Sequence, residues 1–148
     1  MFHHPIPADR RDAALRLLAR AHDLLASSPA AWTTGAFARN RDGISVPYSA
    51  DAACSFCAEG ALNRSHYDVT GRPYGFGSPA YDLAWQALTS AVRRRTGGEL
   101  EFIVEFNDRH ATSAADVLAV FDEAAQLLQD APVSGLPPAP EGPKELVA

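Results

Sequence analysis

Cysteine is scarce in this sequence, and that scarcity excludes several classes of protein. Only Cys54 and Cys57 occur among 148 residues, whereas small secreted domains held together by disulfides carry more cysteines at wider spacing. A structural zinc site needs four ligands, and among the five histidines only His3 and His4 form a ligand-like pair. We therefore expect a reducing compartment, no metal and no cofactor.

Positive charge is not in excess, and long hydrophobic runs are missing. The formal net charge is −5 and the isoelectric point is near 5.4, whereas proteins that neutralise phosphates need a concentrated positive field. No apolar run approaches the roughly 20 residues that span a bilayer, and the first residues lack the regions of a signal peptide. These absences predict a cytoplasmic protein that binds neither nucleic acid nor membrane.

The apolar residues that are present suffice for one domain. Hydrophobic residues make up 47% of the chain, and a chain of this size buries about two-thirds of its unfolded surface. We expect an N-terminal extension over residues 1–8, a single globular α+β domain over residues 9–130 and a proline-rich disordered tail over residues 131–148.

About four helices are predicted, because apolar residues repeat at the helical period in four segments. Capping residues and helix stops place them over residues 9–27, 51–64, 79–96 and 113–130. One core should hold six residues from these stripes: Leu17, Leu18, Trp85, Leu88, Leu118 and Phe121. The fold class is therefore mainly α.

The second predicted helix has an unusual buried face. Ser49 or Asp51 is expected to cap it, and its inward positions hold mostly small residues, Gly60 and Ala61 among them. Glycine inside a helix costs about 1 kcal/mol relative to alanine, so a packing gain should offset it. We expect another element to lie against Gly60 and Ala61.

A small β element is expected to complete the domain. Residues 32–38 and 44–48 flank a turn rich in Asn, Asp and Gly, which predicts an antiparallel hairpin. Residues 99–106 alternate between apolar and acidic side chains, the period of a half-buried strand, and would extend the hairpin to a three-stranded sheet. Residues 65–77 are expected to form a long loop.

Cys57 invites several interpretations. Cys54 and Cys57 together could form a redox pair, but the strand that precedes thioredoxin-like sites is missing. Cys57 followed by Glu59 looks like part of a deaminase site, yet no later cysteine supplies the other zinc ligands. Two alternatives remain open: Cys57 is a nucleophile near a helix start, or it is a buried core thiol.

If Cys57 were a nucleophile, its partners would come from later in the chain. His66 or His110 would be the base, and Asn107 or Asp108 would orient that base. A second interpretation treats Asn107 and Asp108 as a turn-and-capping pair. A third makes Asp108, with Arg39 or His110, a polar floor under the hairpin.

Four motifs give the sequence a resemblance to a known family. They are W-x-x-G at residues 32–35, A-R-x-x-D-G at residues 38–43, C-x-x-G-A-L at residues 57–62, and N-D-x-x-x-T at residues 107–112. In this order they resemble a family of small bacterial and phage proteins described only as a domain of unknown function.

The resemblance covers roughly residues 10 to 130 and implies no activity. The chain departs from the family pattern with Asn40 in place of an aspartate, and with Phe56 and Phe106 in place of tryptophans, substitutions that keep the turn chemistry and the aromatic packing. The resemblance directs attention to Trp32, Arg39, Cys57, Asn107 and Asp108.

The sequence favours a small noncatalytic binding or accessory protein, because no catalytic pattern in it exceeds chance. Ligand-binding candidates are Trp32, Arg39, Asn107 and Asp108. The alternative is a thiol-dependent hydrolase or transferase that uses Cys57. The partner is expected to be a small molecule or a protein, and a second copy of the chain stays open as a further partner.

Overall fold

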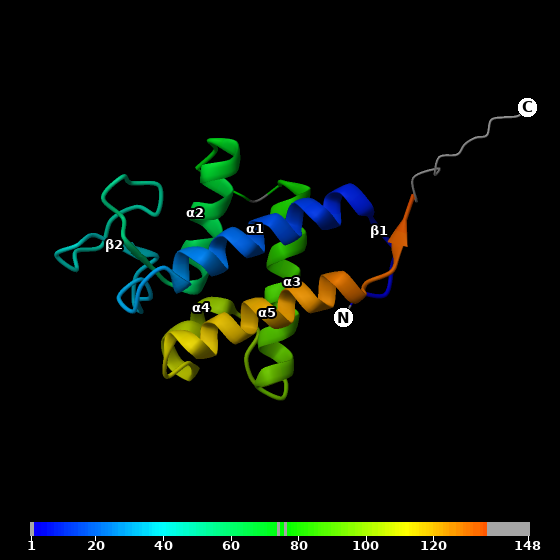
Figure 1. Cartoon of the computed structure of the whole chain (residues 1–148). Helices are drawn as coiled ribbons and strands as arrows, with labels where there is room; N and C mark the ends of the chain where they lie inside the picture. The colour runs from blue at the N-terminus through cyan, green and yellow to red at the C-terminus, as the bar shows by residue number, and fades with distance from the viewer. Residues whose placement is uncertain (1, 74, 76, 136–148) are drawn as a thin grey trace, which may run out of the picture.

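Three long helices form where the sequence carries apolar stripes. The computed structural model describes residues 2–73, 75 and 77–135. Within it, α1 (Ala8–Ala26), α3 (Pro79–Arg95) and α5 (Ala114–Asp130) match the predicted segments closely. Pro79 occupies the first turn of α3, where its missing N–H has no helical partner to lose. The fold is mainly helical, as predicted (Figure 1).

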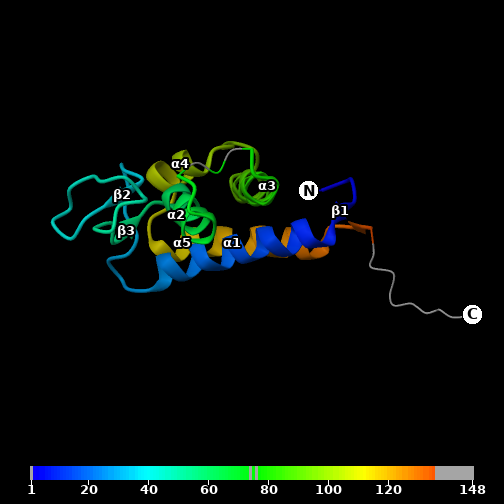
Figure 2. The ribbon, with the colours of Figure 1, turned by 90° about the horizontal axis from the view of Figure 1, so that it is seen from above.

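The helices pack in two layers. Helices α1 and α5 lie side by side in one layer, and α2 (Ala58–Thr70) and α3 lie across them (Figure 2). Leu17, Leu18, Leu88 and Phe121 are buried as predicted, and Trp85 and Leu118 are half-buried against the same core.

Helix α2 starts later than predicted. The chain from Pro47 to Ala53 forms turns, in which the Ala50 N–H donates to the Pro47 carbonyl and the Ala53 N–H to the Ala50 carbonyl. The N-cap of α2 is Cys57, whereas Ser49 or Asp51 was expected. The helix also continues to Thr70, so the predicted long loop over residues 65–77 is wrong in its first half.

The predicted close approach at Gly60 is confirmed. A Cβ atom built on Gly60 would lie 1.9 Å from the carbonyl oxygen of Phe37 and 2.7 Å from its carbonyl carbon. The same Phe37 oxygen accepts a hydrogen bond from the Cys57 N–H at 3.1 Å. Glycine is therefore required at position 60, because the backbone before β2 lies directly on the first turn of α2.

The predicted hairpin is present in part, because the Asn40 N–H donates to the Ile44 carbonyl at 2.9 Å and the Val46 N–H donates to the Ala38 carbonyl at 3.1 Å. The turn over residues 40–44 closes through the Asn40 side chain, but its second arm makes a single bridge, Ser45 to Arg39. The actual partner of β2 (Ala38–Arg39) is β3 (Ser55–Phe56), which runs antiparallel to it. The hairpin prediction therefore holds for the turn and the first contacts between its arms, but the pairing of β2 with β3 was not predicted, because the turn signal was local and this pairing was not.

The predicted strand over residues 99–106 is wrong. The segment enters a short helix α4 (Ile103–Glu105) and a π-helical turn η1 (Phe106–His110), closed by a hydrogen bond from the Ala111 N–H to the Phe106 carbonyl at 2.8 Å. Ile103 and Phe106 are buried, while Phe102 is 60% exposed. The helical spacing of the two buried residues decided the structure, and the alternating pattern around them was incidental.

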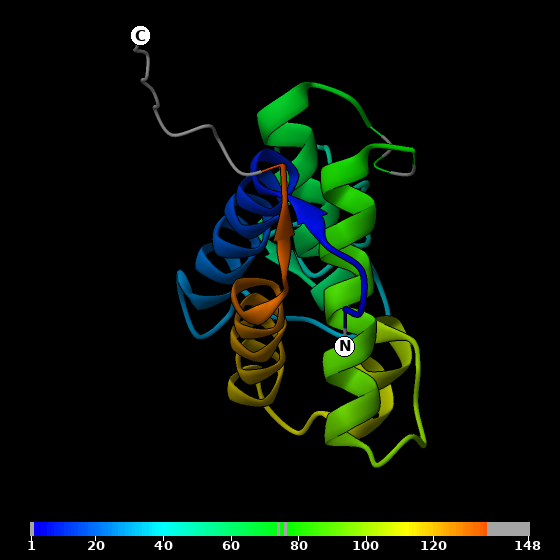
Figure 3. The ribbon, with the colours of Figure 1, turned by 90° about the vertical axis from the view of Figure 1, so that its right-hand side faces the viewer.

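The two ends of the described chain meet. Strand β1 (Ile6–Pro7) pairs in parallel with β4 (Val133–Ser134), and the Ile6 N–H donates to the Pro132 carbonyl at 2.9 Å (Figure 3). The tail predicted over residues 131–148 therefore begins with paired residues. Its larger part, residues 136–148, lies outside the described residues.

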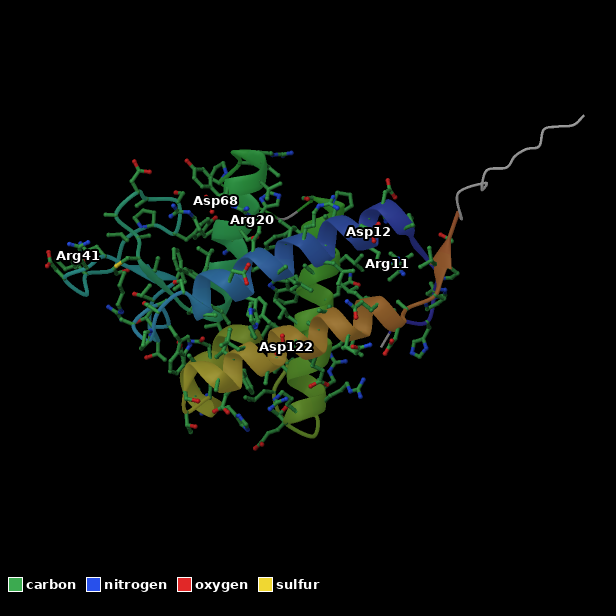
Figure 4. The ribbon with its side chains drawn as sticks, viewed as in Figure 1. Arg11, Asp12, Arg20, Arg41, Asp68 and Asp122 are labelled. Carbon is green, nitrogen blue, oxygen red and sulfur yellow. The ribbon has the colours of Figure 1, made fainter. Side chains whose placement is uncertain are left out.

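Ion pairs join the helices at the surface. Arg20 of α1 contacts Asp68 of α2 at 3.5 Å (Figure 4). Arg64 lies one turn before Asp68 and contacts it at 2.9 Å. Exposed pairs of this kind contribute about 0–1 kcal/mol each. Within the described part of the chain, no helix combines the length and the apolar character needed to cross a bilayer.

Candidate functional site

Asn107 lies where the motif residues meet, in η1, and its side chain is fully buried. Its Oδ1 accepts hydrogen bonds from Trp32 Nε1 at 2.7 Å and from the Ala58 N–H at 3.0 Å. Its Nδ2 donates to the Thr33 carbonyl at 3.0 Å and to Asp108 Oδ1 at 2.9 Å. Because both oxygen lone pairs and both N–H groups are used, Asn107 ties the loop before β2, the first turn of α2 and η1 together.

Asp108 extends this network to the surface. Its Oδ1 accepts a second hydrogen bond, from the Gly35 N–H at 3.1 Å, while the residue itself is exposed. Gly35 has a φ of +76°, a left-handed conformation that favours glycine. The carboxylate is therefore held in one orientation by two donors from different parts of the chain.

Arg39 holds the same loop from the other side. Its Nε donates to Thr33 Oγ1 at 3.0 Å, its Nη1 to the Gly43 carbonyl at 3.0 Å and its Nη2 to the Thr34 carbonyl at 2.9 Å. Among the described residues it makes no ion pair with a carboxylate, Asp108 included. Arg39 thus shapes the loop and is not joined to Asp108 in a polar floor.

Cys57 has a structural task at the start of α2. Its Sγ accepts a hydrogen bond from the Gly60 N–H at 3.3 Å, and the residue is 3% exposed. Burial raises the pKa of the thiol to about 11, partly opposed by the backbone N–H groups of Gly60 and Glu59, and the nearby carboxylates of Glu59 and Asp108 raise it further. The thiol is therefore protonated at neutral pH, unlike a nucleophilic cysteine.

The two candidate histidines lie elsewhere. His66 is on α2 about 13 Å further along the helix axis, where it is 2% exposed and contacts the Tyr81 ring edge-on at 5.6 Å. Burial, followed by the positive charge of Arg72, lowers the pKa of His66. His110 is exposed and stacks on Phe106 at 4.9 Å. No hydrogen bond in the described part of the chain joins Cys57 to either ring.

A pocket of about 260 Å³ opens between the loop before β2, the start of α2 and α4. Its apolar lining residues include Ala36, Phe37 and Val104, and its polar lining residues are Ser45, Cys57 and Asp108. Of the four ligand-binding candidates, Asp108 lines this pocket, and Trp32, Arg39 and Asn107 hold the surrounding backbone in place. We call this cavity the Asp108 pocket.

The sequence model of a family of unknown function, DUF6197, matches residues 9–127. The chain belongs to this family. The match covers all the residues that build the Asp108 pocket, and it agrees with the resemblance drawn from the four motifs. No curated protein and no solved structure matches the chain significantly.

A second polar cluster of this DUF6197 chain, between α2 and α3, was not predicted from the sequence. Burial raises the pKa of Glu59, which the Trp85 indole N–H faces without reaching full hydrogen-bond geometry. Tyr81 donates to Asn63 Oδ1 at 2.5 Å, and burial raises its pKa as well. The sequence did contain a signal for this cluster, because residues four apart lie on one helix face. Glu59 and Asn63 have this spacing on α2, and Tyr81 and Trp85 have it on α3.

The described residues offer no obvious metal centre. No group of three or more His, Cys, Asp or Glu side chains in this part of the chain is arranged to hold a metal ion. Cys54, the second cysteine, is exposed beside Arg41, Asp42 and Asp51 at the outer end of the loop.

Proposed function

We propose that this protein is a small noncatalytic binding protein and that the Asp108 pocket is its binding site. The observation that carries the proposal is the Asn107 network, in which a fully buried side chain fixes the pocket walls through hydrogen bonds. A preformed cavity loses little conformational entropy when a ligand binds. At about 260 Å³ it lies just below the usual range for ligand pockets, so it suits a small group or a single side chain.

The alternative, a thiol-dependent hydrolase or transferase, is favoured by one observation: Cys57 is among the residues that line the same pocket. Its thiol pKa of about 11 and its capping hydrogen bond with Gly60 count against this alternative. A base within hydrogen-bond reach would also be needed, and His66 and His110 lie in other surroundings.

Alkylation of the cysteines separates the two alternatives. With iodoacetamide at about pH 8, mass spectrometry of the native protein should show modification of the exposed Cys54 alone, because the Cys57 thiol is buried and protonated. Concentrated guanidinium chloride should make both cysteines reactive. Cys54→Ser is the control and should remain unmodified while native. Rapid native modification of Cys57 in that variant would favour the thiol enzyme.

Binding itself is tested by mapping amide shifts in a ¹H–¹⁵N NMR spectrum. Short probes of three kinds, n-butylammonium, butyrate and n-butanol, are titrated into the protein. At least one should shift the amides of Gly35, Val104 and Asp108, and Val104→Trp should abolish the shifts by filling the pocket. Val69→Trp adds the same side chain at a 57% exposed site away from the pocket lining and should leave the shifts intact. Unchanged pocket amides with every probe would contradict the proposal.

The setting of this function is part of the proposal. Two free cysteines suit a reducing compartment, and the resemblance to small bacterial and phage proteins favours a cytoplasmic, phage-associated role. The net charge of −5 favours a small molecule or a protein as the partner over a nucleic acid.

A further inference from the structure

The Asp108 pocket carries a negative charge that makes no ion pair among the described residues. Among the described lining residues, Asp108 is the one with a charged side chain. The nearest arginine in sequence, Arg109, pairs with Glu105 at 2.9 Å. Arg39 is engaged with loop carbonyls, and Arg41 extends from the outer end of the loop (Figure 4).

The start of α2 does not turn the pocket into an anion site. Free N–H groups at a helix N-terminus attract anions, but here the Ala58 N–H is taken by Asn107 and the Gly60 N–H by Cys57. The charges that act on the Cys57 sulfur are the carboxylates of Glu59 and Asp108, both negative. The electrostatic complement of this pocket is a cation.

The hydrogen bonding of Asp108 also selects the kind of cation. Oδ1 already accepts from Gly35 and Asn107, and Oδ2 has no hydrogen-bond partner among the described residues. A guanidinium binds a carboxylate best as a fork that uses both oxygens, whereas an ammonium acts as a compact charge that one oxygen can hold. One free oxygen therefore favours an ammonium group.

The apolar walls of the pocket indicate what kind of chain should carry the ammonium group. Ala36, Phe37 and Val104 offer apolar surface beside the carboxylate, and Phe37 is 45% exposed. An aromatic ring at the rim also attracts a nearby cation through its π face. A short aliphatic stem would cover this surface while its charged end reaches Asp108.

We propose that the Asp108 pocket binds a primary ammonium group carried on a short aliphatic stem. The inference rests on the proposed binding function and specifies its ligand class. Two sources share this chemistry, a free alkylamine and the side chain of a lysine residue in a partner.

The test compares matched probes in the NMR titration. n-Butylammonium should bind at the pocket at least about tenfold more tightly than n-butanol, butyrate or n-butylguanidinium. Butanol and butyrate cannot form the charge-assisted hydrogen bond with Asp108, and the guanidinium forms it poorly with one free oxygen. Asp108→Asn, which can still accept from Gly35, should weaken n-butylammonium binding about tenfold or more. Asp51→Asn removes a carboxylate that lines a different pocket and should have little effect.

The outcomes separate this inference from the proposed function. If butanol or butyrate binds as tightly as n-butylammonium to the wild type, or if Asp108→Asn binds unchanged, the ammonium inference is overturned while a binding pocket remains. If no probe shifts the pocket amides, both proposals fail. Nα-acetyl-lysine methylamide distinguishes the two sources: binding equal to or tighter than that of n-butylammonium supports a lysine side chain, and much weaker binding supports a free amine. The wild-type comparison stands even if a variant is poorly folded.

Discussion

Replacing Asn107 by alanine should lower the free energy of unfolding by about 3–5 kcal/mol. In the wild type, the Trp32 indole N–H, the Ala58 N–H and the Thr33 carbonyl each form a hydrogen bond with the Asn107 side chain. The change leaves all three groups without this partner. An unsatisfied buried polar group costs about 1–3 kcal/mol, and the Asn107 side chain that satisfies these three groups is fully buried. Thermal unfolding should show a loss of about 10 °C in melting temperature for a chain of this size.

The control for this prediction is Asn40→Ala. The Asn40 side chain also accepts two backbone hydrogen bonds, from Asp42 and Ile44, but both are exposed to solvent. Water can replace them, so the expected cost is about 1 kcal/mol or less. Equal losses at the two sites would show that burial of the Asn107 network contributes little.

Gly60→Ala should destabilise the protein by about 2–3 kcal/mol, although alanine is the better helix former by about 1 kcal/mol. The new methyl group would overlap the Phe37 carbonyl, whose oxygen lies 1.9 Å from the Cβ position. Moving that carbonyl breaks its hydrogen bond with the Cys57 N–H and displaces the Phe37 wall of the Asp108 pocket. Chemical denaturation should therefore show lower stability, and the NMR titration should show weaker binding.

Gly98→Ala is the matched control for the glycine position. Nothing lies within 4 Å of a Cβ at Gly98, but its φ of +88° strains any other residue. The expected cost is about 1 kcal/mol from backbone conformation alone, without an effect on binding. A Gly60→Ala variant as stable as the wild type would mean that the loop before β2 is not fixed against α2.

Much of the helical framework could be predicted from the sequence, because helical periodicity and caps are local signals. Ser78 and Pro79 marked the start of α3 correctly. The start of α2 was misplaced because Ser49 and Asp51 are better capping residues than cysteine, and the cap that forms depends on a backbone contact with Phe37 that no local pattern reveals.

The candidate site was also predicted only in part: its residues were identified from the sequence, but their contacts were not. The motifs singled out Trp32, Asn107 and Asp108, and the structure joins them in one hydrogen-bonded network. Their assembly could not be predicted, because Trp32 and Asn107 are distant in sequence and the segment that leads into η1 was taken for a strand. The juxtaposition of Glu59 and Trp85 was not predicted, since it depends on how α2 and α3 pack.

The pairing of β1 with β4 has a consequence for the order of folding. Nearly the whole chain lies between Ile6 and Val133, so closing this contact from an unfolded chain carries a large loop-closure entropy. The ladder should form after the helices have packed and should open before they separate. Because it lies at the opposite end of the molecule from β2 (Figure 1), fraying of the chain ends can occur while the pocket stays intact.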